Sequence, residues 1–181
     1  VIAAQKISNH EGGLAAFYTV PGDFGTSAVA LGDVNGDGIT DLAVGSPFEY
    51  DQGGSGLGAV YVLFMNVTVI GAQKISNEHG GLSAFYTLDA YDNWLRYMDF
   101  FGASLAALGD WDGDGIPDMA VGAYGDDDGA YYAGAVYIIF LNSDGTAKAM
   151  TKISNSHGNL ASFYTVSGYF GSSIAAIGDL D

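Results

Sequence analysis

The stretch that decides the fold is Asp33-Val34-Asn35-Gly36-Asp37-Gly38-Ile39-Thr40-Asp41, and it returns as Asp110-Trp111-Asp112-Gly113-Asp114-Gly115-Ile116-Pro117-Asp118. Side-chain oxygens occupy positions one, three, five and nine of both stretches. A hard cation such as Ca²⁺ takes oxygen ligands, and alternate residues of a tight loop can supply them. Without a metal, two carboxylates about 4 Å apart repel by roughly 4 kcal/mol at an effective dielectric near 20. The spacing therefore predicts a calcium-binding loop that occurs twice.

Two other interpretations of these loops have to be compared with the metal site. Asp, Asn and Gly are common turn formers, so a solvated acidic turn is possible, but one turn rarely repeats this spacing. An EF-hand needs flanking helices and a Glu at position twelve. Val44 and Val121 stand there. The apolar run Leu42-Ala43-Val44-Gly45 after the first loop predicts a strand, which argues against an EF-hand.

The composition limits the fold and the partners. Hydrophobic residues make up 49% of the 181 residues and charged residues 14%, with 28 glycines, which favours short apolar strands joined by tight turns. The formal net charge is −16 with only five Lys and Arg, so nucleic acid is not an expected partner. The longest apolar stretch, residues 57–71, is interrupted by Asn66 and is short for a membrane span, so no membrane insertion is expected. The sequence has no cysteine, which excludes disulfides.

Internal repeats organise the chain into one repeat region over residues 1–181. A Lys-Ile-Ser-Asn phrase recurs three times, and each copy is followed by an aromatic phrase and then by Phe-Gly. Each full repeat holds about four short β-rich segments, which predicts four-stranded propeller blades whose acidic loop joins the first strand to the second. The expected repeats cover about residues 1–69, 70–147 and, in part, 148–181.

The order of motifs resembles a known family. Phe-Gly, the acidic loop, Gly-Ser-Pro (45–47) and Gly-Ala-Val-Tyr-Val (58–62) form the pattern of FG-GAP repeats, which build the β-propeller of integrin α-subunits and of bacterial integrin-like surface proteins. The resemblance implies an all-β fold of about two and a half FG-GAP-type blades, an open or partial propeller. It also implies an extracellular or cell-surface protein whose blades bind Ca²⁺ and serve adhesion or assembly.

The same resemblance implies the ligands of each loop. Two departures limit it: Tyr124 replaces the proline found at Pro47, and the third loop is present only in part. The implied ligands are Asp33, Asn35, Asp37, the Ile39 carbonyl and Asp41 in the first loop, Asp110, Asp112, Asp114, the Ile116 carbonyl and Asp118 in the second, and Asp179 and Asp181 in the third.

The number of repeats leaves two architectures open. Propellers close with typically four to eight blades, and both ends of this sequence fall inside a repeat. The chain is therefore expected to be either a piece of a longer, closed propeller that binds a protein or glycan, or a unit that joins copies of itself head to tail. In the second case a neighbour would complete the third loop, and the product would be a surface fibre.

Features outside the loops give further expectations. The second repeat carries an insertion at about residues 88–100, whose aromatic residues and arginine suit either an interface or local packing. Asn66-Val67-Thr68 is a sequon for N-glycosylation. The interface candidates in the insertion are Tyr91, Trp94, Arg96 and Tyr97.

The remaining polar residues do not predict an enzyme. Residues 126–128, three aspartates between glycines, are interpreted as a solvated turn, with an additional cation site as the alternative. His10, His79 and His157 are interpreted as turn residues, and no nucleophile elbow, phosphate loop or triad arrangement is evident. The sequence thus predicts a structural or adhesive protein, with a non-catalytic module of a secreted hydrolase as an alternative.

Overall fold

The structure, a computed structural model, describes residues 5–8, 10–14, 23–50, 57–82, 98–162 and 168–178. The regular secondary structure of this part of the chain is almost entirely β, which confirms the predicted fold class. Its named elements are β1 (Ser27–Gly32), β2 (Asp41–Ser46), β3 (Ala59–Asn66), β4 (Thr68–Ile75), β5 (Ser104–Gly109), β6 (Asp118–Ala123), β7 (Ala135–Leu141), β8 (Ala147–Ser154) and the short 3₁₀ helix η3 (Leu160–Ser162).

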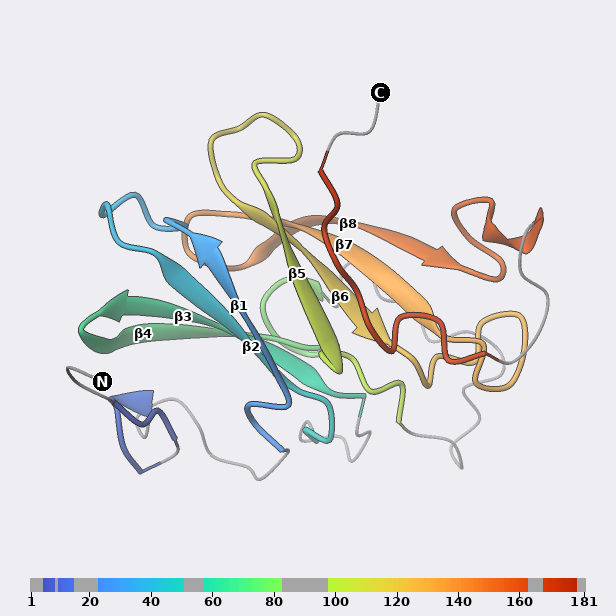
Figure 1. The fold of residues 1–181 in the computed structure, drawn as a ribbon, viewed down its shortest axis with the longest axis horizontal. Coiled ribbons are helices and arrows are strands. Elements are labelled where there is room, and N and C mark those ends of the chain that lie inside the picture. Colours follow the sequence, from blue (N-terminus) through green and yellow to red (C-terminus); the bar gives the residue numbers. More distant parts are fainter. Residues whose placement is uncertain are drawn as a thin grey trace.

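The strands form two four-stranded antiparallel sheets, ordered β1-β2-β3-β4 and β5-β6-β7-β8 (Figure 1). Val, Ile, Leu and Tyr fill β3 and β7, which lie inside their sheets, and these side chains suit a pleated, buried surface. The acidic loops join β1 to β2 and β5 to β6, so strands rather than helices flank both of them. The expectation that the loop connects the first two strands of a blade is confirmed.

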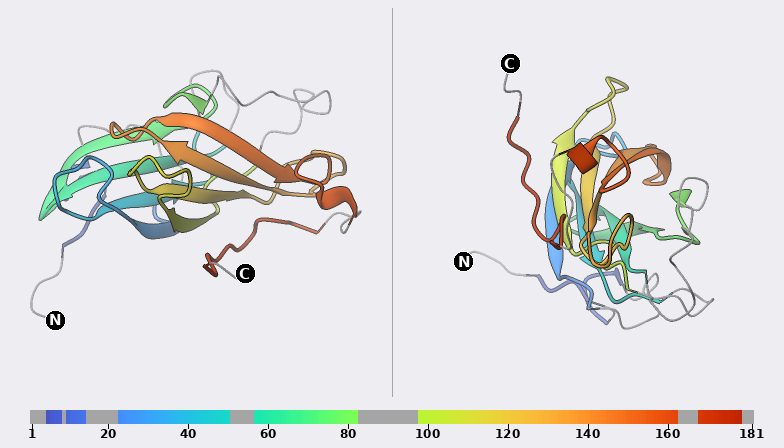
Figure 2. Two further views of the ribbon diagram at one scale, coloured as in Figure 1. Left: turned by 90° about the horizontal axis from the view of Figure 1, so that it is seen from above. Right: turned by 90° about the vertical axis from the view of Figure 1, so that its right-hand side faces the viewer.

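The two sheets share one hydrophobic core and lie face against face (Figure 2). Gly58 forms a parallel bridge with Phe101, and the Ser27 hydroxyl donates to the Gly102 carbonyl at 2.7 Å. The same contacts recur one repeat later between the second sheet and the segment 170–178. They are the bridge between Gly134 and Phe170 and the hydrogen bond from Ser104 to the Gly171 carbonyl, at 2.7 Å.

This recurrence explains the Phe-Gly motif. Phe101 is buried in the shared core, while Gly102 has φ +91° and brings its backbone against β2 of the preceding sheet. The Phe-Gly segments of the second and third repeats therefore pack on the preceding sheet in the same way, as successive propeller blades do.

The antiparallel order places the turns at two opposite ends of each sheet. The acidic loops share one end with the β3–β4 and β7–β8 turns, and the loops after β2 and β6 lie at the other end (Figure 1). The Lys-Ile-Ser phrase lies near this second end, because residues 74–75 end β4 and residues 152–154 end β8.

Candidate metal centre

The first aspartate of each loop organises the loop backbone. One oxygen of Asp33 accepts hydrogen bonds from the amides of Gly36 (2.7 Å) and Asp37 (3.0 Å), and the other accepts from Gly38 (2.7 Å). Gly36 and Gly38 have φ values of +79° and +83°, and a Cβ at either would meet nothing within 4 Å. Glycine is thus required here by backbone conformation, not by lack of space. Asp110 accepts the same three hydrogen bonds, at 2.8, 2.9 and 2.9 Å.

The ninth residue ties the loop to the body of its sheet. Asp41 is fully buried, and its two oxygens accept from the Val34 amide (3.0 Å) and from the Met65 amide at the end of β3 (2.9 Å). Asp118 makes the equivalent bonds to Trp111 and Leu141, both at 3.0 Å. Burial raises the pKa of Asp118 above its usual value. Position nine therefore connects the loop, the second strand and the third strand.

Three carboxylates of the second loop converge on one point. Oxygens of Asp110, Asp112 and Asp118 all lie within 4.8 Å of one another. An ionised carboxylate has about four lone-pair sites, so these groups retain acceptors beyond their backbone bonds. All are hard oxygen donors, the kind that Ca²⁺ prefers. The residues present therefore fit a hard divalent cation.

The first loop differs from the second at position three. Asn35 accepts a hydrogen bond from the Asp37 amide at 3.0 Å and donates one to the Asp37 carboxylate at 3.2 Å. Position five is used alike in both loops, because Asp37 and Asp114 accept from the amides of Ile39 (2.8 Å) and Ile116 (2.9 Å). The partial third loop, with Asp179 and Asp181, lies outside the described residues.

A lysine from outside the second loop contacts its carboxylates. Lys148 Nζ lies 2.7 Å from Asp112 Oδ2 and also bonds Asp114 Oδ2. Hydrogen bonding to Asp112 and Asp114 raises the pKa of Lys148, and the bond from Lys148 lowers the pKa of Asp114. The Lys148 ammonium places a positive charge next to the loop carboxylates, as a bound metal ion would. Lys148 lies on β8, and no motif in the sequence points to it as a partner of the loop.

Two other predicted sites have different outcomes. The interface candidates Tyr91, Trp94, Arg96 and Tyr97 lie outside the described residues. Asn66 is exposed in the tight β3–β4 turn, where Val67 has φ +63°. This turn lies at the same end of the first sheet as the acidic loop. Because the Asn66 side chain is exposed, it is accessible for N-glycosylation, which stays a prediction.

A row of aromatic rings lies at the opposite end of the sheets, and no motif in the sequence predicts it. Phe100, the last residue of the insertion, stacks on Tyr124 with ring centroids 4.5 Å apart. Edge-to-face contacts extend the row from Phe48 through this pair to Tyr169, Tyr132 and Tyr131. The spacing of these aromatics in the sequence is irregular, so only the fold reveals that they form one row.

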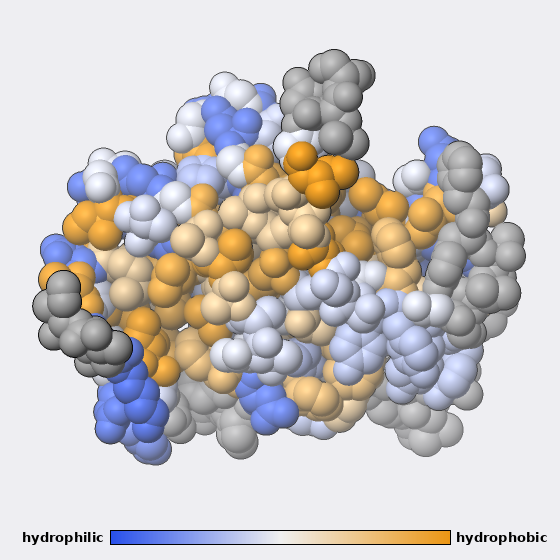
Figure 3. Space-filling model, in the orientation of Figure 1, coloured by the Kyte–Doolittle hydropathy of each residue, from blue (hydrophilic) through white to orange (hydrophobic). Residues whose placement is uncertain are grey.

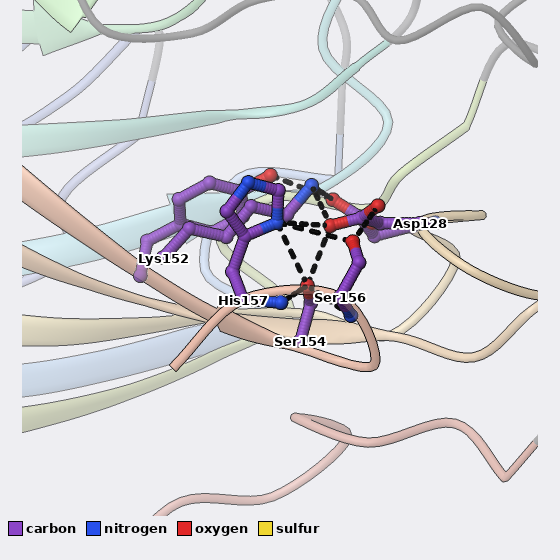
Figure 4. Close-up of polar contacts among 7 residues, drawn as sticks. Asp128, Lys152, Ser154, Ser156 and His157 are labelled. Carbon is purple, nitrogen blue, oxygen red and sulfur yellow. Dashed lines mark hydrogen bonds and ion pairs between the residues drawn. The ribbon is translucent and has the colours of Figure 1, made fainter. Parts of the chain in front are cut away.

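A second polar cluster surrounds Lys152 on β8 (Figure 4). Asp126 and Asp128 are only 3% and 6% exposed, and Lys152 Nζ lies 2.9 Å and 3.2 Å from their carboxylates. The Tyr137 hydroxyl donates to Asp126 at 2.6 Å. The interpretation of residues 126–128 as a solvated turn is therefore wrong for two of the three aspartates, because β7 and β8 supply partners that bury them.

Ser154, Asp128 and His157 meet in this cluster, but not as a catalytic triad. His157 Nδ1 lies 2.7 Å from Asp128 and 3.4 Å from Ser154, and the Ser154 hydroxyl donates directly to Asp128 at 2.5 Å (Figure 4). In a triad one ring nitrogen faces the acid and the other faces the nucleophile. Here one nitrogen faces both groups, so the arrangement suits structural hydrogen bonding.

Asp99 makes the stability of this region depend on pH. Burial, and then the charge of Asp126, raise the pKa of Asp99 to about 7. The folded state therefore binds a proton that the unfolded state releases near pH 4, and stability should fall as pH rises from about 4 to 7. We expect the variant Asp99→Asn to lose this dependence, gaining about 3 kcal/mol over wild type between pH 5 and pH 8.

Urea unfolding of both proteins at pH 5 and pH 8, in saturating Ca²⁺, measures this difference. Titratable groups present in both proteins change the two unfolding free energies equally, so the difference between the proteins reports Asp99. An equal change with pH in wild type and Asp99→Asn would show that Asp99 is not the responsible group.

Comparisons with known proteins agree with this geometry. The FG-GAP repeat model matches residues 24–63 and 101–139, which contain β1–β3 and β5–β7. The chain is 36% identical to mouse integrin alpha-2 over 102 residues, 38% identical to human integrin alpha-7 over 109 residues, and 33% identical to Xenopus laevis integrin alpha-5 over 115 residues.

These matches cover 56%, 60% and 62% of this chain but only 8%, 8% and 10% of the relatives' own length. In the described part of the chain, no helix has the length and hydropathy of a membrane span. In both sheets the acidic loop joins the first two strands, and the Phe-Gly motif lies where a repeat contacts the preceding sheet. The chain therefore contains two FG-GAP repeats, at residues 24–63 and 101–139.

Proposed function

We propose that this chain is a calcium-stabilised part of an integrin-like β-propeller in an extracellular or cell-surface protein. Ca²⁺ binds the loops 33–41 and 110–118, and its role is structural. The observation that carries the proposal is the convergence of Asp110, Asp112 and Asp118 oxygens in the second loop.

The position of the loops explains what the metal does. Each loop forms the first hairpin of a blade, and its ninth residue also holds the third strand. A cation that gathers the loop carboxylates removes their mutual repulsion and fixes this junction. Because the unfolded chain lacks the preformed ligand cage, binding energy becomes folding energy.

Thermal unfolding in Ca²⁺, Mg²⁺ and chelator tests the proposal. At 100 times the dissociation constant each site contributes about 2.7 kcal/mol, so two sites raise the midpoint on the order of 10 °C. Mg²⁺ should stabilise much less, because it demands a tighter octahedral site. The variant Asp37→Ala with Asp114→Ala, which removes one exposed ligand per loop, should lose most of the shift. Equal midpoints in Ca²⁺ and chelator would contradict the proposal.

An exposed apolar face supports a larger propeller. Figure 3 shows apolar atoms gathered over β1, β5 and the segment 170–178, where Ala28, Ala30 and Ile177 are exposed. Exposed apolar faces of this kind mark contact surfaces. Further blades of the same propeller would cover the apolar face over β1, β5 and the segment 170–178. A protein or glycan partner would then bind elsewhere, and the aromatic row offers large amphipathic side chains for it.

Self-assembly is the second candidate. Within the described residues, no strand pairs with residues 174–178, and Ile177 is 72% exposed. An unpaired extended segment can accept a strand from another copy. Light scattering in Ca²⁺ and in chelator would test this: long particles that disperse in chelator favour a fibre, and a monodisperse monomer in both conditions contradicts it.

A further inference from the structure

Lys148 occupies the carboxylate cluster from the side of β8. Its Nζ contacts Asp112 and Asp114, at positions three and five of the second loop. The side chains of Lys148, Asp112 and Asp114 are each about one-third exposed. The contact therefore lies at the open side of the cluster, where an ion in solution would also arrive.

A β-bulge places this side chain. Phe140 pairs with Ala149 and Leu141 pairs with Ala147, which leaves Lys148 as the extra residue between them. A bulge bends its strand and redirects a side chain. The bulge next to the loop end thus aims Lys148 at the loop carboxylates.

The first sheet carries the same bulge with a different residue. Phe64 pairs with Gly71 and Met65 with Val69, so Ile70 is the counterpart of Lys148, and it is 55% exposed. The first loop also has Asn35 where the second has an aspartate. The first loop has three carboxylates, a charge of −3; the second has four plus the lysine, −4 + 1 = −3.

We propose that Lys148 is a tethered cation that competes with Ca²⁺ for the second loop, so that the two loops bind calcium with separately tuned affinities. This inference rests on the proposed function. Asp112 is one of the three converging carboxylates and also contacts the ammonium, so an ion at the cluster and Lys148 share at least this carboxylate. The two positive charges repel, and Lys148 swings into solvent when the ion binds.

The competition has a second consequence in the metal-free protein. The ammonium offsets the repulsion between Asp112 and Asp114, whereas the first loop has only an isoleucine at the same place. Lys148 therefore keeps the second loop closed without metal. Removing it should make the metal-free state less stable and the calcium-bound state relatively more stable.

Calorimetric calcium titration of paired variants tests this inference. In the Asp37→Ala background, which silences the first loop, Lys148→Ile should tighten calcium binding on the order of tenfold, and Lys148→Arg should change it little. In the Asp114→Ala background, Ile70→Lys should weaken binding to the first loop by a similar factor. In chelator, Lys148→Ile should unfold at lower temperature than wild type.

The outcomes separate the two claims. Unchanged or weaker calcium binding by Lys148→Ile, with normal binding by wild type, would overturn the competition and leave the proposed function intact. A wild-type chain that takes up no calcium in either loop would overturn both. Tighter calcium binding by Lys148→Ile together with a less stable metal-free state would support the inference. Replacing a lysine with a purely structural role would not tighten calcium binding.

Discussion

The variant Gly45→Ala is expected to lose about 3 kcal/mol of unfolding free energy, because it forces the two sheets apart. A Cβ on Gly45 would lie 2.0 Å from the Gly102 carbonyl oxygen and 2.3 Å from the Ser27 hydroxyl. The first contact is with backbone of the next repeat, which cannot rotate away. Relief therefore requires β5 to separate from β2. Chemical denaturation monitored by tryptophan fluorescence or circular dichroism measures the loss.

A matched glycine provides the control. Gly71 in β4 also has a strand conformation, but its added Cβ would meet only the Phe64 side chain, at 3.1 Å. Gly71→Ala should therefore change the unfolding free energy by less than about 1 kcal/mol. Gly122→Ala should repeat the large loss, since its Cβ would lie 2.0 Å from the Gly171 carbonyl. Equal, small effects at Gly45 and Gly71 would contradict the blade contact described above.

The variant Lys152→Met is expected to cost about 3–5 kcal/mol, since it leaves buried carboxylates without their cation. Asp126 and Asp128 each lie within 3.2 Å of Lys152 Nζ, and Asp99 is buried near them. The methionine fills similar space, so the loss reports charge and not volume. Urea unfolding of wild type and variant measures the loss.

The repeats supply the control for this variant too. Lys6 occupies the same place in the Lys-Ile-Ser phrase, but it and its partner Glu11 are mostly exposed, 3.6 Å apart. Lys6→Met should cost less than about 0.5 kcal/mol, as exposed ion pairs contribute little. Lys152→Arg should retain much of the stability. A small loss at Lys152, close to that at Lys6, would show that the cluster does not depend on its cation.

The fold could be predicted because its determinants are local and repeated. The loop spacing, the apolar run after it and the Phe-Gly motif each lie within a few residues, and each occurs at least twice. Such patterns specify a turn, a strand or a close backbone approach without knowledge of distant residues. The two four-stranded sheets and the position of the loops follow from them.

The polar contacts that distinguish the two repeats could not be predicted in this way. Lys148 reaches the second loop only because a bulge in β8 redirects it. Asp126 and Asp128 look like turn residues in the sequence, and their burial depends on Tyr137 and Lys152 from two other strands. These contacts join residues far apart in the chain, so their charge pairing becomes visible only in three dimensions.

The central claim is that each of the two complete loops binds one calcium ion. Native mass spectrometry of the 181-residue chain in calcium acetate measures the stoichiometry directly, and magnesium acetate provides the comparison. We expect two calcium ions per chain, one after Asp37→Ala or Asp114→Ala alone, and none after both. A wild-type chain that binds no calcium, or one that keeps two ions after both substitutions, would contradict the account.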